Sequence, residues 1–318
     1  MAQAAIQNPA FFDDGAAREA LESVRWPDGP VCPHCGNLDQ EKIAKGQGTA
    51  HRAGLYYCAA CNGQFTVTVG TVMERSKISL SKWLFAMHLV GASKKGMSAL
   101  QLSRMLGVTY KTAWFLCHRI REAMTEVNPT PIGGEGKIVE ADTTYIGGRE
   151  KNKHVGKRKA GNIGGAGKQI VHTLVERDGR ARSEHIANIS GATLRTVLDE
   201  RVSRKSTLMT DTAGGYLHVG KEFTRHEMVD HGKDEYVRGD AYTNTAEGRF
   251  SLMKRAVYGT HHSISAAHLS RYLVEWDFKY NTRKNSDGER AALIAKGIEG
   301  KRLTYRPTNG NHRSTAVH

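Results

Sequence analysis

Four of the five cysteines of this 318-residue chain stand in two short pairs. Cys32 and Cys35 lie in VCPHCGN, Cys58 and Cys61 lie in YYCAACNGQF, and 22 residues, 36–57, separate the two pairs. Two C-x-x-C pairs match a closed tetrahedral zinc site, whose four thiolates leave no position open for chemistry. The spacing therefore predicts a structural zinc ribbon and argues against a disulfide scaffold. A redox role is the alternative, although a single C-x-x-C pair would serve it.

The charge of the chain favours a polyanionic partner. Lys and Arg number 46 against 32 Asp and Glu, so the formal net charge is +14. On charge alone, an anionic membrane would serve as well as a nucleic acid. The sequence has no run of about 18 apolar residues and no basic-then-apolar signal peptide. We therefore expect a soluble, cytoplasmic, nucleoid-associated protein of about two or three domains.

Helical apolar spacing follows the cysteine pairs. The segment 79–92 has this spacing, and 97–124 reads as two helices separated by a turn at Gly107. A short helix, a glycine turn and a longer helix are the layout of a DNA-reading helix-turn-helix. An ordinary helical hairpin is the alternative, but the positive charge and the neighbouring ribbon favour DNA. The residues that would face the groove, at the start of the second helix, are Thr109, Tyr110, Lys111 and Thr112.

From residue 137 onwards the pattern changes to that of an α/β domain. The stretch KIVEADTTYIGG, 137–148, alternates as a half-buried strand does, with Val139 and Ala141 on its apolar face. The other face carries Glu140 and Asp142, and a charge on an interior strand is costly unless something offsets it. A hairpin turning at Asp178-Gly179, a helix over 191–202, a strand over 206–211 and a helix over 244–259 follow. This order predicts a ribonuclease H-like α/β fold.

A basic, glycine-rich segment follows the first strand. Residues 149–168 hold seven Lys or Arg and one acid. This composition favours a loop over a phosphate backbone, and a merely solvated insertion is the alternative. The candidate phosphate contacts in this segment are Lys157, Arg158 and Lys159.

Three acids are candidates for a catalytic site. In a ribonuclease H-like layout the first and fourth strands are neighbours, so Asp142, midway along the first, and Asp211, at the end of the fourth, converge. Glu247, on the helix that follows, is the best candidate for a third acid. The 35 residues 212–246 separate it from Asp211.

Other residues near Glu247 carry weaker signals. Asp240 and Glu235 are rival acids, since both lie close by in the chain. Lys254 falls two turns further along the same helical face, where its ammonium group could hold a phosphate. Asn244 shares that face, and its alternative role is to cap the helix.

Shifts in composition suggest domain boundaries. Proline and glycine in 128–137 mark a linker. The expected parts are an N-terminal segment with the zinc ribbon (1–75), a helix-turn-helix region (76–128), the catalytic domain (137–285) and a basic C-terminal tail (286–318).

These motifs together resemble a known family. Asp142, Asp211 and Glu247, followed by Lys254, are similar to the DDE motif of transposases and retroviral integrases. The wider pattern resembles the zinc-ribbon DDE transposases of bacterial insertion sequences, the ISXO-like family. The matching segments, in family order over residues 25–282, are RWPDGPVCPHCG, YYCAACNGQFTVTVGTVME, KTAWFLCHRIREAM, DTTYIGG, NTAEGRFSLMKRAVYGTHHSIS and HLSRYLVEWDFKYN.

The resemblance implies a transposase that cleaves DNA at the ends of its element and transfers the freed 3′-OH into target DNA. It also implies two catalytic Mg²⁺ ions, one shared by Asp142 and Asp211 and one held by Glu247. The expected partner is double-stranded DNA, with no membrane, and joining two element ends implies a homodimer or a higher assembly. The alternatives are a DNA-binding regulator with a degenerate catalytic domain and a repair-type nuclease that cuts without joining.

Overall fold

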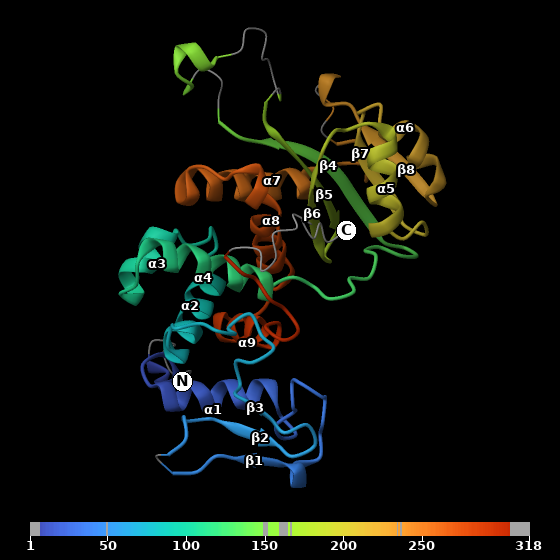
Figure 1. The fold of residues 1–318 in the computed structure, drawn as a ribbon. Helices are drawn as coiled ribbons and strands as arrows, with labels where there is room; N and C mark the ends of the chain where they lie inside the picture. The colour runs from blue at the N-terminus through green and yellow to red at the C-terminus, as the bar shows by residue number, and fades with distance from the viewer. Residues whose placement is uncertain are drawn as a thin grey trace. The chain divides into compact units, whose positions relative to one another are not determined.

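The computed structural model describes residues 7–48, 50–148, 152–158, 165, 167–233, 235 and 237–305. The chain divides into two compact units. The colour bar of Figure 1 gives the residue numbers by which the segments of each unit can be found. The first unit holds Met1–Ser93, Met97–Thr125 and Asn285–His318, and the second holds Lys94–Gly96 and Glu126–Lys284. The zinc ribbon, the helix-turn-helix region and the C-terminal segment therefore belong to one unit, where the sequence suggested three separate parts.

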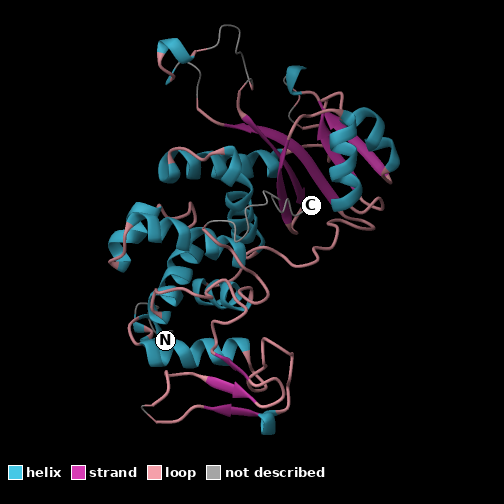
Figure 2. Cartoon of the chain, viewed as in Figure 1, coloured by secondary structure: helices cyan, strands magenta, loops and turns pink. Residues whose placement is uncertain are grey.

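A small three-stranded antiparallel sheet forms the ribbon (Figure 2). Each strand has three residues, so the sheet depends on aromatic side chains for a core. Trp26 packs edge-on against Tyr56 and Phe65, with ring centroids 5.4 and 5.7 Å away, and Tyr56 stacks on Phe65 at 5.5 Å. The elements of this part are α1 (Asp14–Arg25), β1 (Ile43–Lys45), β2 (Tyr56–Cys58) and β3 (Gly63–Phe65).

Both helices of the predicted helix-turn-helix form, and a short turn separates them. Ser98 caps the first helix by accepting a hydrogen bond from the Gln101 N–H, and Gly107 ends it in the left-handed region at φ 62°. Thr109 caps the second helix by accepting from the Thr112 N–H. The helices of this region are α2 (Leu80–Ala92), α3 (Ala99–Leu106) and α4 (Tyr110–Ala123).

The segment expected to be a basic tail, 286–318, instead begins with a helix, α9 (Asp287–Lys296). Ser286 and Glu289 form a capping box at the start of this helix. Its buried residues include Ile294 and Ala295, and the helix packs against α2 within the first unit. The helix was not predicted from the sequence, because the positive charge of the segment was given more weight than the apolar residues of this short helix.

The second unit is built on a five-stranded sheet with the order β6-β5-β4-β7-β8. The strands β4, β5 and β6 are antiparallel neighbours, whereas β7 pairs with β4, and β8 with β7, in parallel. This is the ribonuclease H-like topology that the sequence predicted, with one further strand, β8, at the edge. The strands are β4 (Ile138–Ile146), β5 (Gln169–Glu176), β6 (Ala181–Ile186), β7 (Thr207–Asp211) and β8 (Arg225–Val229).

Helices cover both faces of this sheet. Val139 and Ala141 of β4 belong to the apolar core under α5 and α6, whereas Ile146 of the same strand belongs to the core under α7 and α8. Figure 1 shows α7 and α8 on the side of the sheet away from α5 and α6. The helices are α5 (Gly191–Arg201), α6 (Tyr216–Val219), α7 (Asn244–Ala256) and α8 (Ala266–Asn281).

The burial of β4 differs from the expectation of one apolar and one polar face. Thr143 and Tyr145, on the expected apolar face, are only half-buried. Glu140 and Asp142, on the other face, are 0% and 8% exposed, because α7 packs on that side of the strand. Both acids lie in the interior of the unit, so each carboxylate needs a compensating partner.

Candidate active site and zinc site

Asp142 and Asp211 lie level with each other on neighbouring strands. Ala141 of β4 pairs with Thr210 of the parallel strand β7, so the next residue of each strand is level with the other and points to the same face. Asp211 ends β7 and is half-buried, and the Ala213 N–H donates to its Oδ1 at 3.1 Å. The structure thus brings these two carboxylates together.

Burial and several charged groups shift the pKa of Asp142. Burial raises this pKa most, and the negative charges of Asp211 and Glu247 raise it further, so that it reaches about 7. The Thr143 N–H, which donates to Oδ1 at 2.6 Å, and the positive charge of Lys254 act in the opposite direction. The three predicted acids and Lys254 are therefore close enough to interact electrostatically at Asp142.

Helix α7 supplies Glu247 and two of the predicted phosphate contacts. Glu247 lies half-buried in its first turn, and Lys254 is exposed in its last turn. Asn244 is the first residue of the helix and is exposed, while Thr243 takes the N-cap position. The alternative role of Asn244 as the helix cap is therefore not what the structure has.

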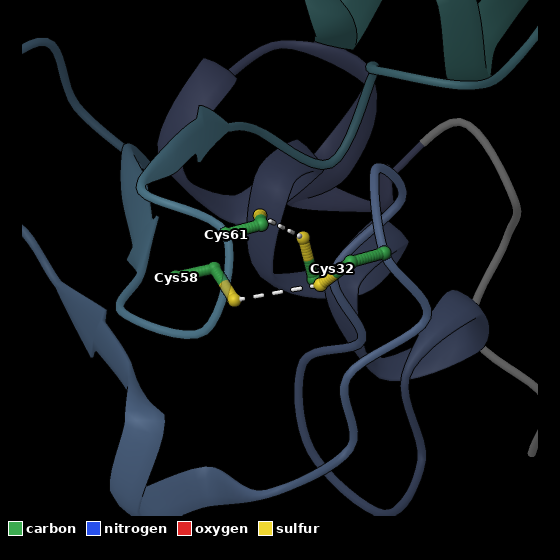
Figure 3. Close-up of side chains that lie close together, drawn as sticks. Cys32, Cys58 and Cys61 are labelled. Carbon is green, nitrogen blue, oxygen red and sulfur yellow. Dashed lines mark hydrogen bonds between the residues drawn. The ribbon is translucent and has the colours of Figure 1, made fainter.

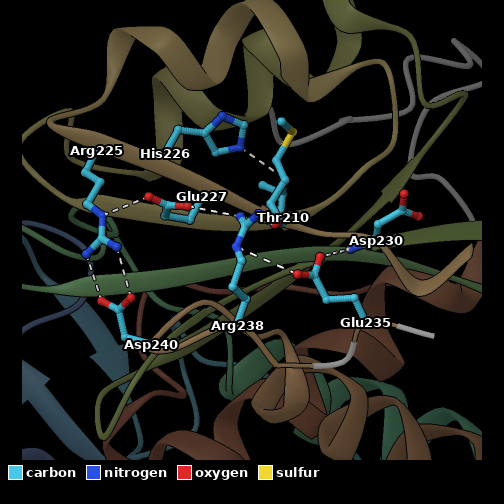
Figure 4. A network of polar contacts seen from close by, with 9 residues as sticks. Thr210, Arg225, His226, Glu227, Asp230, Glu235, Arg238 and Asp240 are labelled. Carbon is cyan, nitrogen blue, oxygen red and sulfur yellow. Dashed lines mark hydrogen bonds and ion pairs between the residues drawn. The ribbon is translucent and has the colours of Figure 1, made fainter. Parts of the chain in front are cut away.

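The two rival acids are paired with arginines in a separate polar network (Figure 4). Arg225 donates to both carboxylate oxygens of Asp240, at 2.8 and 2.9 Å. Arg238 lies 3.8 Å from a carboxylate oxygen of Glu235. Glu247, and neither rival, is the third acid that raises the pKa of Asp142.

Glu140 is a further buried acid of this region, to which the sequence gave no role. Its carboxylate accepts hydrogen bonds from Arg177 Nε at 2.7 Å, from Thr245 N and Oγ1, both at 2.9 Å, and from Ala246 N at 3.1 Å. Both oxygens are engaged, so this carboxylate does not offer a lone pair to a metal ion. Its place two residues before Asp142, on the same strand face, was the only signal in the sequence.

The four cysteines form a tight cluster whose Sγ atoms all lie within 4.8 Å of one another (Figure 3). Cys32 Sγ is 3.7 Å from Cys61 Sγ, and Cys35 Sγ is 3.8 Å from Cys58 Sγ. A tetrahedral zinc ion with Zn–S bonds of about 2.3 Å separates its sulfur ligands by about 3.8 Å. The cluster therefore fits the predicted structural zinc site.

Backbone donors and the neighbouring histidine agree with this interpretation. Burial raises the pKa of the Cys58 thiol, but hydrogen bonds from the N–H groups of Cys61 and Ala60, together with those to the Cys35 and Cys32 side chains, lower it to about 7. A thiolate is the form that binds zinc. His34, inside the first pair, contacts the Gln64 carbonyl oxygen through Nε2 at 3.1 Å and is not part of the cluster.

The residues predicted to read DNA stand at the start of α4. Tyr110 and Lys111 are exposed, and Lys111 Nζ lies 4.7 Å from the centroid of the Tyr305 ring. Thr112 is half-buried, and its hydroxyl group hydrogen-bonds to that of Thr109 at 2.9 Å. The side chains of Tyr110 and Lys111 are thus presented to solvent.

Of the three candidate phosphate contacts in the basic segment after β4, Arg158 is the one whose side chain the structure describes. It is exposed, and its Nε donates to the Lys153 carbonyl oxygen at 2.9 Å. Lys159 and the side chain of Lys157 lie outside the described residues. Throughout the described part of the chain, no helix is both long enough and apolar enough to cross a bilayer.

Comparisons with known proteins connect both sites to one family. Residues 133–281 match the ISXO2-like transposase domain, and residues 12–64 match the transposase zinc-ribbon domain. An uncharacterized protein in the transposable element ISH50 of Halobacterium salinarum is 30% identical over 276 residues, which cover 83% of this chain and 89% of that protein.

The crystal structure of the Mos1 strand transfer complex is a more distant match. It shares 14% identity, covers 63% of this chain and 70% of its own, and has a TM-score of 0.26, which is too low to inform on this chain. The two domain matches and the ISH50 relative confirm the resemblance inferred from the sequence. The chain belongs to the family of ISXO2-like transposases with an N-terminal zinc ribbon, and its function is that of a transposase.

Proposed function

We propose that this transposase is a DDE enzyme in which Asp142, Asp211 and Glu247 hold two Mg²⁺ ions. The observation that carries the proposal is the level pair of Asp142 and Asp211, with the pKa of Asp142 raised to about 7 by burial and by the two other acids. Carboxylates gathered in an interior repel one another unless a cation offsets their charge. Carboxylate oxygens are also the ligands that Mg²⁺ prefers.

The spread of the three carboxylates favours two ions over one. Within the described part of the chain, the cysteines are the one set of three or more ligand groups that lies within 4.8 Å, so the acids are more widely spaced. Two ions would suit such a set better than one. We assign Asp142 and Asp211 to one ion and Glu247 to the other. When bound, the ions lower the pKa of the attacking group and neutralise the leaving oxygen.

The reaction proceeds in two displacements at one site. At the element end, a water oxygen bonds to phosphorus, the bond from phosphorus to the 3′ oxygen breaks, and that oxygen takes up a proton. The freed 3′-OH then loses its proton and bonds to a phosphorus atom of target DNA, while the bond from that phosphorus to its own 3′ oxygen breaks and the leaving oxygen takes up a proton. Lys254 and Asn244, exposed on the helix that carries Glu247, hold the phosphates.

The first unit would select the DNA that the second unit cuts. The start of α4 would contact the element end, and the basic segment after β4 would follow the phosphate backbone. Bringing two ends together requires a dimer or a higher assembly, and binding to chromosomal DNA would keep the protein at the nucleoid. The residues proposed for these contacts are Tyr110, Lys111, Thr112, Lys157, Arg158 and Lys159.

The test uses a labelled duplex that carries the ends of the DNA encoding this chain. We expect the wild-type protein with Mg²⁺ to give nicked and joined products, and Asp211→Asn to give neither. Glu235→Gln is the matched control, because Glu235 is an acid of the same region that pairs with Arg238. It should retain both products.

Other results of this assay would favour one of the two alternative functions. Nicks without joining would point to a repair-type nuclease. Tight binding of the ends without cleavage by the wild-type protein would contradict the enzymatic proposal and favour a DNA-binding regulator.

A further inference from the structure

Helix α7, which carries Glu247, begins without a side-chain cap of its own. Its N-cap residue, Thr243, makes no capping side-chain hydrogen bond, although the first N–H groups of a helix lack partners within it. The Glu140 carboxylate on β4 takes this role, because Oε2 accepts from Thr245 N at 2.9 Å and from Ala246 N at 3.1 Å. A negative charge at this end also complements the helix dipole.

Arg177 holds the other side of the same carboxylate. Its Nε donates to Glu140 Oε1 at 2.7 Å. Its two remaining nitrogens donate to the carbonyl oxygens of Asp240 and Tyr242, both at 2.9 Å, and the guanidinium lies 3.5 Å from the centroid of the Tyr242 ring. One arginine thus ties the segment leading into α7 to strand β4.

The pair of Glu140 and Arg177 is here called the bracket. It lies close to two of the proposed metal ligands, Asp142 on β4 and Glu247 on α7. Glu140 precedes Asp142 by two residues on one face of β4, a separation of about 7 Å. Ala246, which donates to Glu140, immediately precedes Glu247. Glu140 is fully buried, so water does not compete for its hydrogen bonds and the link between strand and helix is strong.

We propose that Glu140 and Arg177 are positioning residues, which set the distance between Glu247 and Asp142 and thereby the affinity of the active site for divalent cations. The inference rests on the function proposed above. Helix α7 cannot slide or turn against β4 without breaking the hydrogen bonds of a buried charge. Supporting contacts of this kind hold metal ligands in place, and their loss commonly weakens metal binding about 10–100-fold.

The test compares Glu140→Gln with Glu184→Gln in the full-length, zinc-loaded protein. Glu184 forms a similar ion pair, with 2.6 Å between its Oε1 and Arg201 Nε, but it joins β6 to α5 and not to α7. Free Mn²⁺ is measured by electron paramagnetic resonance during a titration, which needs no turnover. We expect Glu140→Gln to weaken Mn²⁺ binding about tenfold and Glu184→Gln to leave it unchanged.

A nicking assay adds a second readout. If the bracket acts on metal affinity, the Mg²⁺ concentration for half-maximal nicking should rise in Glu140→Gln, while the rate at saturating Mg²⁺ largely recovers. A general loss of structure would not recover in this way. Wild-type affinity for Mn²⁺ in Glu140→Gln would overturn the inference.

A milder variant keeps the test decisive if Glu140→Gln does not fold. Thr245→Val removes only the hydroxyl donor, which lies 2.9 Å from Glu140 Oε1, and should weaken Mn²⁺ binding about threefold. A folded Thr245→Val with wild-type affinity would then count against the bracket. Asp211→Asn separates the two proposals, because unchanged Mn²⁺ binding in that variant would refute the catalytic metal site itself.

Discussion

Asp142 and Asp211 stand side by side on β4 and β7 although 68 residues, 143–210, separate them in the chain. Parallel strands need a crossover connection, and here the β5–β6 hairpin and α5 supply it. The two carboxylates are therefore fixed by the centre of the sheet and not by a loop. A site built on such elements holds its geometry more closely than one built on loops.

Replacing Asp142 by Asn should stabilise the Mg²⁺-free, zinc-loaded protein while abolishing nicking. The pKa of Asp142 is raised to about 7 by burial and by neighbouring acids, so at pH 8 its charge destabilises the fold. The neutral amide removes this repulsion, and the Tm of the zinc-loaded protein without Mg²⁺ should rise by roughly 5 °C. Scanning fluorimetry measures this, and Mg²⁺ should stabilise the wild-type protein alone. A fall in Tm without Mg²⁺ would contradict the electrostatic explanation.

Replacing Cys61 by Ser should release the zinc. Loss of one thiolate opens the tetrahedral site, so the metal content after dialysis should fall from about one zinc ion per chain towards zero. Cys117→Ala is the control, since Cys117 is buried in α4 and lies outside the cysteine cluster. Elemental analysis measures the zinc content per chain, and a full complement of zinc in Cys61→Ser would refute the assigned ligand set.

His172 should make the protein sensitive to acid. Burial lowers the pKa of this imidazole from 6.5 to about 4, and within the described residues neither ring nitrogen has a hydrogen-bond partner. Between these two pH values the unfolded chain binds a proton at His172 that the folded chain does not. The free energy of unfolding should therefore fall as the pH drops through this window, by up to about 3 kcal/mol.

The variant His172→Leu should lose most of this acid sensitivity. Urea unfolding at pH 7 and pH 4.5 measures it, and His51→Gln, at an exposed position, should behave as the wild-type protein does. An equal loss of stability in all three proteins would assign the acid sensitivity to other groups.

Replacing Lys111 by Ala should weaken binding to the element ends. A lysine that neutralises one phosphate contributes about 1 to the slope of log K against log salt concentration. Fluorescence anisotropy over a range of salt concentrations gives this slope, and the exposed Lys296 of α9 provides the control variant Lys296→Ala. The same slope in Lys111→Ala and the wild-type protein would remove Lys111 from the proposed contacts.

The parts of the fold that the sequence predicted have local signals. Cysteine spacing marks the ribbon, and the caps at Ser98, Gly107 and Thr109 mark the helices α3 and α4. Strand β8 (RHEMV) was not predicted, because it lies at the sheet edge and carries mostly polar residues. An edge strand is paired and covered less than a central one, so its sequence need not alternate.

The role of Glu140 could not be read from local patterns. Its helix partner, Thr245, comes 105 residues later, and Arg177 lies beside the turn of the β5–β6 hairpin, where a polar residue is unremarkable. On the sequence alone, Glu140 and Asp142 are two acids on one strand face. Only the packing of α7 distinguishes the acid that is saturated with hydrogen bonds from the acid that faces other carboxylates.

Helix α9 completes the core of the first unit, although it lies near the end of the chain. It packs on α2, yet it is translated after the whole of the second unit. A ribosome that stops early therefore releases a chain whose first unit lacks part of its core, even though the ribbon and α4 have already been made.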